Sequence, residues 1–158
     1  MALFAMALSS AVQAGGQGFS SLVLKFPVTD KEMSGNDIDE AIRSKSIEVG
    51  INHVFFAPLY KQVEAITGEK YRHMTIHHLC DAALAKKLAD LNDDLVVMMP
   101  CRIAVVESLE NPGNFSIYST SPGVILEDPS ISKEQKKLIL EFMPKMRELT
   151  EAVASGDF

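Results

Sequence analysis

The stretch from residue 71 to residue 107 most constrains what this chain can fold into. Its sequence, YRHMTIHHLCDAALAKKLADLNDDLVVMMPCRIAVVE, predicts a strand, a turn, a helix, a turn and a second strand. It also contains both cysteines, three of the four histidines and three of the eight methionines. We therefore expect the chemistry of the chain to be concentrated in this strand–helix–strand unit.

Alternation along the strand predicted for residues 71–79 divides its side chains between two faces of a sheet. Four of them share one face: His73, Thr75, His77 and Leu79. Five share the other: Arg72, Met74, Ile76, His78 and Cys80. His73 and His77 are separated by four rises of the strand, roughly 13–14 Å, so they cannot bind one ion unless another element folds between them.

His78 and Cys80 lie closer, roughly 7 Å apart along the same face. A His-x-Cys pair can supply two ligands to a soft metal such as zinc or copper. The alternative is a polar surface histidine beside a small buried cysteine.

The second strand of the unit, predicted for residues 95–106, places Met99 and Cys101 on one face. Pro100 lacks a backbone donor and marks an edge, a bulge or a bend. Arg102 can lower the pKa of the Cys101 thiol if its guanidinium approaches the sulfur. Met99 and Cys101 are candidate ligands of a soft metal, and they are equally common as core residues.

If the helix between these strands crosses the sheet, the strands are parallel, and Cys80 and Cys101 lie at the same end of the sheet. In an oxidising compartment the two thiols can form a disulfide, whereas in a reducing one they stay free or bind metal.

The rest of the chain supplies further strands and helices. Strands are predicted over residues 19–28, 51–56 and 115–120, and helices over 37–48, 59–67, 81–91 and 132–154. The fold class is therefore α+β, with one mixed β-sheet of about five strands, helices packed mainly on one face and a long C-terminal helix. Asn36 is the expected N-cap of its helix, and Asp37, Asp39 and Glu40 are expected to be solvated charges in the first turn.

Bulk composition excludes some classes of partner. The formal net charge of −6 and the pI of about 5.2 argue against nucleic acid, which usually requires a basic face. No apolar run reaches the length of a transmembrane helix. No nucleotide-binding, zinc-protease or serine-hydrolase motif occurs, so the sequence assigns no cofactor.

Residues 1–14, MALFAMALSSAVQA, predict a truncated signal peptide, because an apolar stretch ends in small residues before Gly15. Residues 15–158 would then form a single exported domain, in the periplasm or outside the cell. The basic start of a signal peptide is missing, so an apolar N-terminal helix of a cytoplasmic protein is the alternative.

Three segments resemble a known family: LYKQVEAITG at 59–68, HLCDAALAKKLAD at 78–90 and MMPCRIAVVE at 98–107. The chain is similar to the bacterial and archaeal "domain of unknown function 302" family, over roughly residues 20–158. This resemblance implies a small α+β domain, a homodimer and no established activity. Cys80, Pro100 and Cys101 match the family pattern, whereas His77 and His78 look local to this chain.

Three functions compete at this stage. The first is a binding or redox-accessory module, in which Cys80, Cys101, Met99 and His78 hold a small ligand, a sulfur species or a soft metal. The second is a structural homo-oligomer in which the C-terminal helix docks on a partner. The third is a thiol-dependent enzyme with Cys101 as nucleophile, Arg102 as its activator and a histidine as base.

Overall fold

A computed structural model describes residues 22–158 of the chain. The predicted signal peptide, residues 1–14, and the start of the first predicted strand lie outside the described residues. The elements follow in this order: β1 (Val23–Pro27), α1 (Gly35–Glu48), β2 (Asn52–Ala57), α2 (Leu59–Thr67), β3 (Met74–Cys80), α3 (Ala82–Leu91), the 3₁₀ helix η2 (Asp93–Met98), β4 (Cys101–Glu107), β5 (Phe115–Thr120), α4 (Gly123–Glu127) and α5 (Lys133–Ser155).

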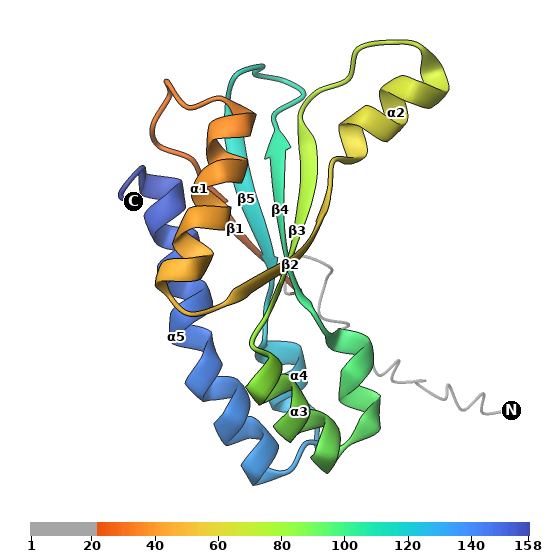
Figure 1. Ribbon diagram of the computed structural model, residues 1–158, viewed down its shortest axis with the longest axis vertical. Coiled ribbons are helices and arrows are strands. Elements are labelled where there is room, and N and C mark those ends of the chain that lie inside the picture. Colours follow the sequence, from red (N-terminus) through yellow and green to blue (C-terminus); the bar gives the residue numbers. More distant parts are fainter. Residues whose placement is uncertain (1–21) are drawn as a thin grey trace, which may run out of the picture.

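All five strands form one sheet in the order β1-β5-β4-β3-β2 (Figure 1). The predicted α+β fold, with about five strands and a long C-terminal helix, is confirmed. The prediction of a mixed sheet is wrong, because all four pairings are antiparallel. The reason lies in α3, which packs on η2 and α5 instead of crossing the sheet, so the chain returns beside β3 in the opposite direction.

The long strand expected over residues 95–106 is also wrong. Residues 93–98 form η2, and β4 begins only at Cys101. The Asn92 side chain accepts a hydrogen bond from the backbone nitrogen of Asp94 at 2.9 Å, which starts a helical turn in an otherwise strand-like apolar sequence. Pro100 lies at the bend between η2 and β4, as expected, and the Met99–Pro100 peptide bond is cis.

Helix α1 begins two residues earlier than its apolar pattern predicts, and its N-cap is Ser34 rather than Asn36. The Asp37 carboxylate accepts from the Ser34 backbone nitrogen at 2.9 Å, and the Ser34 side chain accepts in return from the Asp37 backbone nitrogen at 3.3 Å. This is a capping box, and a second one starts α5 between Ser132 and Gln135.

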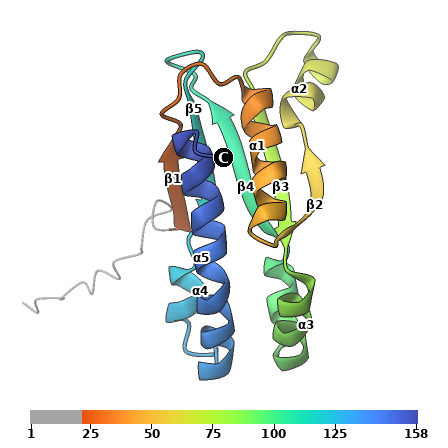
Figure 2. The ribbon, with the colours of Figure 1, turned by 60° about the vertical axis from the view of Figure 1, so that its left-hand side comes forward.

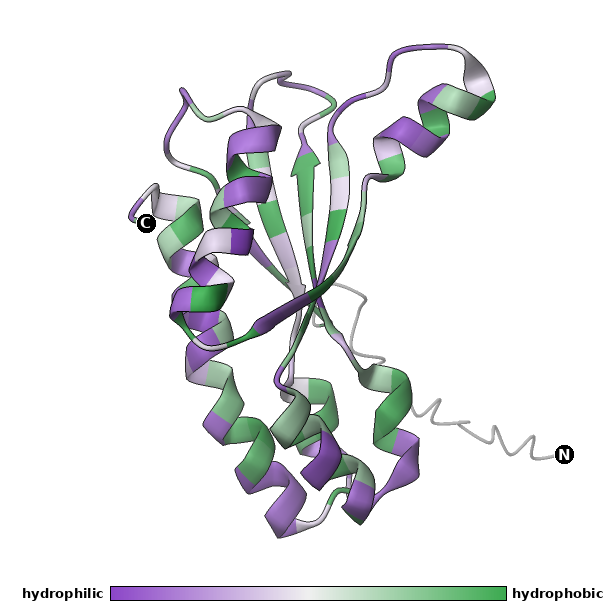
Figure 3. Cartoon of the chain, viewed as in Figure 1, coloured by the Kyte–Doolittle hydropathy of each residue, from purple (hydrophilic) through white to green (hydrophobic). Residues whose placement is uncertain are grey.

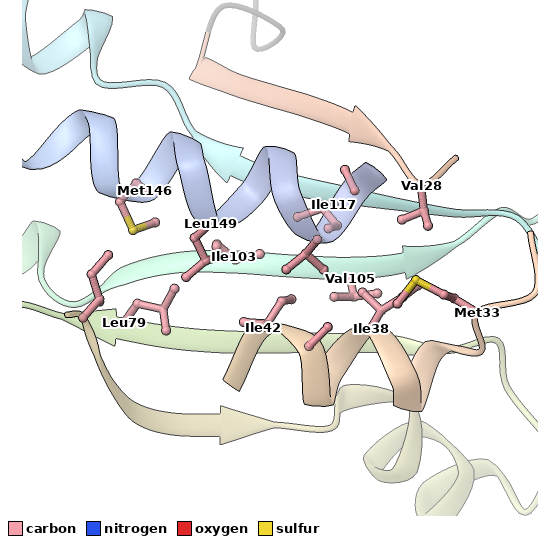
Figure 4. Close-up of a cluster of buried hydrophobic side chains, with 14 of the residues drawn as sticks. Val28, Met33, Ile38, Ile42, Leu79, Ile103, Val105, Ile117, Met146 and Leu149 are labelled. Atoms are coloured by element: carbon pink, nitrogen blue, oxygen red, sulfur yellow. The ribbon is translucent and has the colours of Figure 1, made fainter. Parts of the chain in front are cut away.

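Helices α1 and α5 lie side by side against the same face of the sheet (Figure 2). Along β3, alternate residues Thr75, His77 and Leu79 share one face, as predicted, and that face is the buried one. Apolar and polar residues also alternate along both helices (Figure 3). The core between the two layers is drawn in Figure 4 and consists mainly of aliphatic side chains, among them Ile38, Ile42, Ile103, Val105, Ile117 and Leu149.

The apolar stripe of α5 is used inside this chain. Phe142, Met146, Leu149 and Val153 are all buried in the core. Docking this stripe on a partner would open the core, so the predicted docking of the C-terminal helix would have to use its other faces, and that docking stays a prediction. Within residues 22–158, no helix is both long enough and apolar enough to cross a bilayer.

Leu149→Ala should lower the free energy of unfolding by about 2–5 kcal/mol, because it leaves a cavity in place of a fully buried side chain. Leu140 lies on the same helix with 55% of its surface exposed, so Leu140→Ala should change stability by less than about 0.5 kcal/mol. Urea unfolding of both variants measures the difference, and equal losses would contradict the assignment of the core face.

Candidate functional site

A cavity of about 460 Å³ lies between one end of the sheet and the helices that extend beyond it. Residues of four strands (β1, β3, β4 and β5) and of α3, η2, α4 and α5 line it; these elements are labelled or can be followed by colour in Figure 1. The main core closes one side. A second apolar cluster closes the other, built on Leu88, Leu95 and Ile131. The cavity is therefore the space between two cores.

Local capping holds this lower region in place. β3 ends at Cys80, and the Asp81 carboxylate then accepts hydrogen bonds from the backbone nitrogens of Ala83 and Leu84, both at 3.1 Å. These bonds start α3 directly after the strand and turn the chain away from the sheet. Lys145 of α5 lies 3.5 Å from the same carboxylate, so the start of α3 is tied to α5 across the cavity wall.

Both cysteines contribute to the wall of this cavity. They lie at the same end of the sheet for a different reason than the one predicted: the strands are antiparallel, so β4 begins where β3 ends. Cys101 pairs with Leu79, on the face covered by α1 and α5, and alternation turns Cys80 to the opposite face. Both are free thiols.

The wall is unusually rich in sulfur. Met98, Met99, Met143 and Met146 line it together with the two cysteines. These are six of the ten sulfur-bearing residues of the chain, which has eight methionines and two cysteines. Methionine side chains are flexible and polarizable, so such a wall can adapt to the shape of an apolar guest.

The geometry does not favour Cys101 as a nucleophile. Burial raises the pKa of the Cys101 thiol, the nearby Cys80 raises it further, and the opposing effect of Arg102 is smaller. Burial also raises the pKa of Cys80, with Asp81 adding to it. The expected activation by Arg102 is therefore outweighed, and both residues sit in the wall largely as neutral thiols at neutral pH.

Met99, Cys80, Cys101 and Arg102 all reach the cavity wall, whereas His78 does not. The His78 ring packs on Phe55 at a centroid distance of 5.4 Å. Within residues 22–158, no three histidine, cysteine or acidic side chains are grouped as a metal site would require.

Sequence reasoning missed a second cluster, centred on Asp39. Its side chain is 4% exposed, and the expectation of a solvated first-turn charge is wrong. Oδ1 accepts from Thr75 Oγ1 at 2.7 Å and from His77 Nε2 at 2.8 Å, while His73 Nε2 lies 3.1 Å from Oδ2. The Asp39 carboxylate thus lies between His73 and His77 and contacts both imidazole rings.

The cluster extends to a third histidine on β2. His53 Nε2 lies 2.9 Å from His77 Nδ1. A bulge at Val54 makes this contact compatible with the pairing of β2 and β3. Because of it, both His53 and Phe56 face His77, with ring centroids 5.1 Å and 4.9 Å away.

Charge in this cluster is set by two opposing effects. Burial raises the pKa of Asp39, but its contacts with His73, His77 and Thr75 outweigh that effect and hold the pKa well below the ordinary carboxyl range. Burial, followed by the neighbouring His77 and Arg43, lowers the pKa of His53. Asp39 is therefore ionised at neutral pH and His53 is neutral.

One sequence signal could have revealed this cluster. The buried face of β3 carries His73, Thr75 and His77 in succession, and buried polar groups need hydrogen-bonding partners. A carboxylate on a helix packed against this face could accept hydrogen bonds from several of these donors at once. The alternation was available from the sequence, but the identity of the packed residue on α1 was not.

Asp39→Asn should lower the free energy of unfolding by about 2–4 kcal/mol, because it removes the charge that the buried histidines and Thr75 surround. Glu40→Gln is the matched control. Glu40 is the next residue, 74% exposed, and pairs only with Arg43 at 3.1 Å, so its loss should cost less than about 0.5 kcal/mol. Urea unfolding at neutral pH compares the two.

Stability should also fall as the pH drops below about 6.5. The folded-state pKa of His53 is depressed, so the unfolded chain binds a proton that the folded chain does not. A further loss should begin below about pH 4, where Asp39 is protonated only in the unfolded chain. Unfolding midpoints of the native chain and of His53→Gln test this, since the first loss should shrink in the variant. An unchanged first loss would contradict the assignment.

Comparison with known proteins agrees with this architecture. No curated protein sequence matches the chain. The crystal structure of an uncharacterized conserved protein of the DUF302 type from Bacillus stearothermophilus superposes with a TM-score of 0.68, covering 82% of this chain and 96% of that one. The two sequences are 14% identical, so this likeness concerns the fold alone. The model of the family named Domain of unknown function DUF302 matches residues 28–153, and the chain therefore belongs to that family.

Proposed function

We propose that this protein binds a small, predominantly apolar molecule in the cavity between its two cores. The observation that supports the proposal is the cavity itself, about 460 Å³ in volume and lined mainly by aliphatic and sulfur-bearing side chains. Ligand sites commonly have volumes of roughly 300–1,000 Å³ and mostly apolar walls.

The charges of the wall favour an uncharged or weakly polar ligand. Asp81 faces Lys145 at 3.5 Å, and Arg147 donates to Glu151 at 2.7 Å. Four of the charged groups around the cavity are thus already paired, and an ionic ligand would have to compete with those pairs. Ser119, Thr120 and Thr150 supply hydroxyl groups that can orient a ligand with one polar end.

A soft metal ion is the second candidate ligand, because Cys80, Cys101 and Met99 share the wall with three further methionines. Thioethers and thiolates are the ligands that Cu(I) prefers. Metal binding would have to overcome the raised pKa of both thiols, since a coordinating thiol loses its proton. The apolar molecule is therefore proposed first.

A cavity-filling variant tests the proposal. Ala85 lines the cavity on α3, so Ala85→Phe should reduce the affinity for an uncharged apolar fluorescent probe such as N-phenyl-1-naphthylamine at least tenfold. Ala82→Phe on the exposed side of the same helix should leave the affinity unchanged. Probe binding that is absent, or equally strong in both variants, would contradict the cavity as the site.

The same preparations distinguish the two ligands. Mass spectrometry under native conditions of the purified protein should show an organic adduct that Ala85→Phe lacks. Cu(I) that binds stoichiometrically and is lost in Cys101→Ser, with no organic adduct, would favour the metal instead.

We further propose export and dimerisation, on the evidence of residues 1–14 and of the family resemblance. N-terminal sequencing of the protein recovered outside the cytoplasm tests cleavage near Gly15, and light scattering tests the dimer.

A further inference from the structure

Two hydrogen bonds link Asp39 to His53 through His77. When the imidazole rings of His77 and His53 are both neutral, the protons in these bonds have one consistent assignment. The Asp39 carboxylate only accepts, so His77 donates through Nε2 at 2.8 Å. His77 Nδ1 then carries no proton and accepts from His53 Nε2 at 2.9 Å. Nδ1 of His53 is left as a proton acceptor at the outer end of the chain of bonds.

His53 also differs from the inner groups in exposure. Asp39 and His77 are buried, at 3% and 0% exposure, while His53 is half-buried. It is one of the residues that line a surface hollow of about 520 Å³, together with Arg43, Gly50 and Asn52. This hollow shares no residue with the apolar cavity.

Arg43 is fixed beside His53. Its guanidinium carbon lies 4.4 Å from the centre of the Phe56 ring, and Nη1 is 3.1 Å from Glu40 Oε2. The charged and titratable groups that act on His53 are Arg43 and Asp39 from α1 and His77 and His78 from β3. An anion that displaces Glu40 from Arg43 would lie beside a neutral imidazole, so the hollow suits a guest that brings both a negative charge and a proton.

We propose that Asp39, His77 and His53 form a proton relay, and that His53 is a general base for a small oxyacid anion bound in this hollow. The hydroxyl of the anion gives its proton to His53 Nδ1, and the oxygen keeps the electron pair and its charge beside Arg43. The imidazolium that forms is stabilised through His77 by the Asp39 carboxylate, as a buried aspartate stabilises the histidine of a catalytic triad. The site is independent of the apolar cavity and of the ligand proposed there.

A purely structural role accounts for the inner bonds of this cluster, because Asp39 Oδ1 accepts from Thr75 and His77, and His53 supplies the partner of the buried His77 Nδ1. It assigns no task to the outer nitrogen of His53. The relay therefore predicts a chemical property of His53 that packing alone does not: a nucleophilicity that depends on Asp39.

Modification by diethyl pyrocarbonate measures this property in the native full-length chain. Nδ1 of His53 attacks a carbonyl carbon of the reagent, ethyl carbonate leaves, and the Nε2 proton moves to His77 and is held there by Asp39. His78 is the internal control, because it is also half-buried but its ring packs on Phe55 without a hydrogen bond to the relay. Peptide mapping at neutral pH should show His53 reacting several-fold faster than His78.

Two further arms separate the relay from simple exposure. In Asp39→Asn the rate at His53 should fall several-fold while the rate at His78 stays constant; if that variant does not fold, the comparison within the native chain still decides. Inorganic phosphate, which carries a hydroxyl at neutral pH, should protect His53 more than sulfate, which carries none. Equal rates at the two histidines, an unchanged rate in a folded Asp39→Asn, or equal protection by the two anions would overturn the proposal.

Discussion

One buried carboxylate joins the helical layer of this protein to its sheet. Apolar contacts such as those of Ile38 and Ile42 are strong but non-directional, so they hold α1 against the sheet without fixing its rotation. Asp39 supplies the direction, because its Oδ1 must meet Thr75 and His77 of β3 at hydrogen-bond distance while Oδ2 lies beside His73. Gly35 contributes from the same helix: a Cβ at that position would come within 2.4 Å of the His73 ring. The helix is thus held at one height and one angle.

The opposite end of the sheet is organised by a different constraint. Because β3 and β4 are antiparallel neighbours, the segment between them need not cross the sheet, and α3 and η2 project beyond its edge. They require a core of their own, which they form with α4 and the first half of α5. Two cores that share one long helix do not close completely against each other, and the sulfur-rich cavity lies at the junction.

How much of this could be predicted depended on the range of each interaction. Alternation within β3 was predictable, because it is a property of six or seven consecutive residues. The direction of β4 was not, because it depends on where α3 packs, and an amphipathic helix has the same sequence pattern whether it lies over a sheet or beyond its end. Cys80, Met99 and Cys101 line one cavity, but Cys80 and Cys101 were expected to come together through parallel strands, and Met99 was expected to join Cys101 by alternation along a strand that does not extend to it. Asp39 was missed because an acidic residue in a first helical turn is ordinarily solvated, and only the fold brings it to the Thr75 and His77 donors on a strand more than thirty residues away.

The bulge in β2 has a consequence for changes in chain length. His53 and Phe56 are separated by three residues, so a regular strand would turn them to opposite faces. Val54 is the extra residue that allows both to face His77. Deletion of either Val54 or Phe55 would leave one residue between His53 and Phe56, restore a regular ladder and keep both rings on the inner face, but deletion of Phe55 would also remove the ring that packs on His78. Variants that are one residue shorter in this strand should therefore have lost a residue between His53 and Phe56, and the histidine cluster sets a rule for insertions and deletions as well as for substitutions.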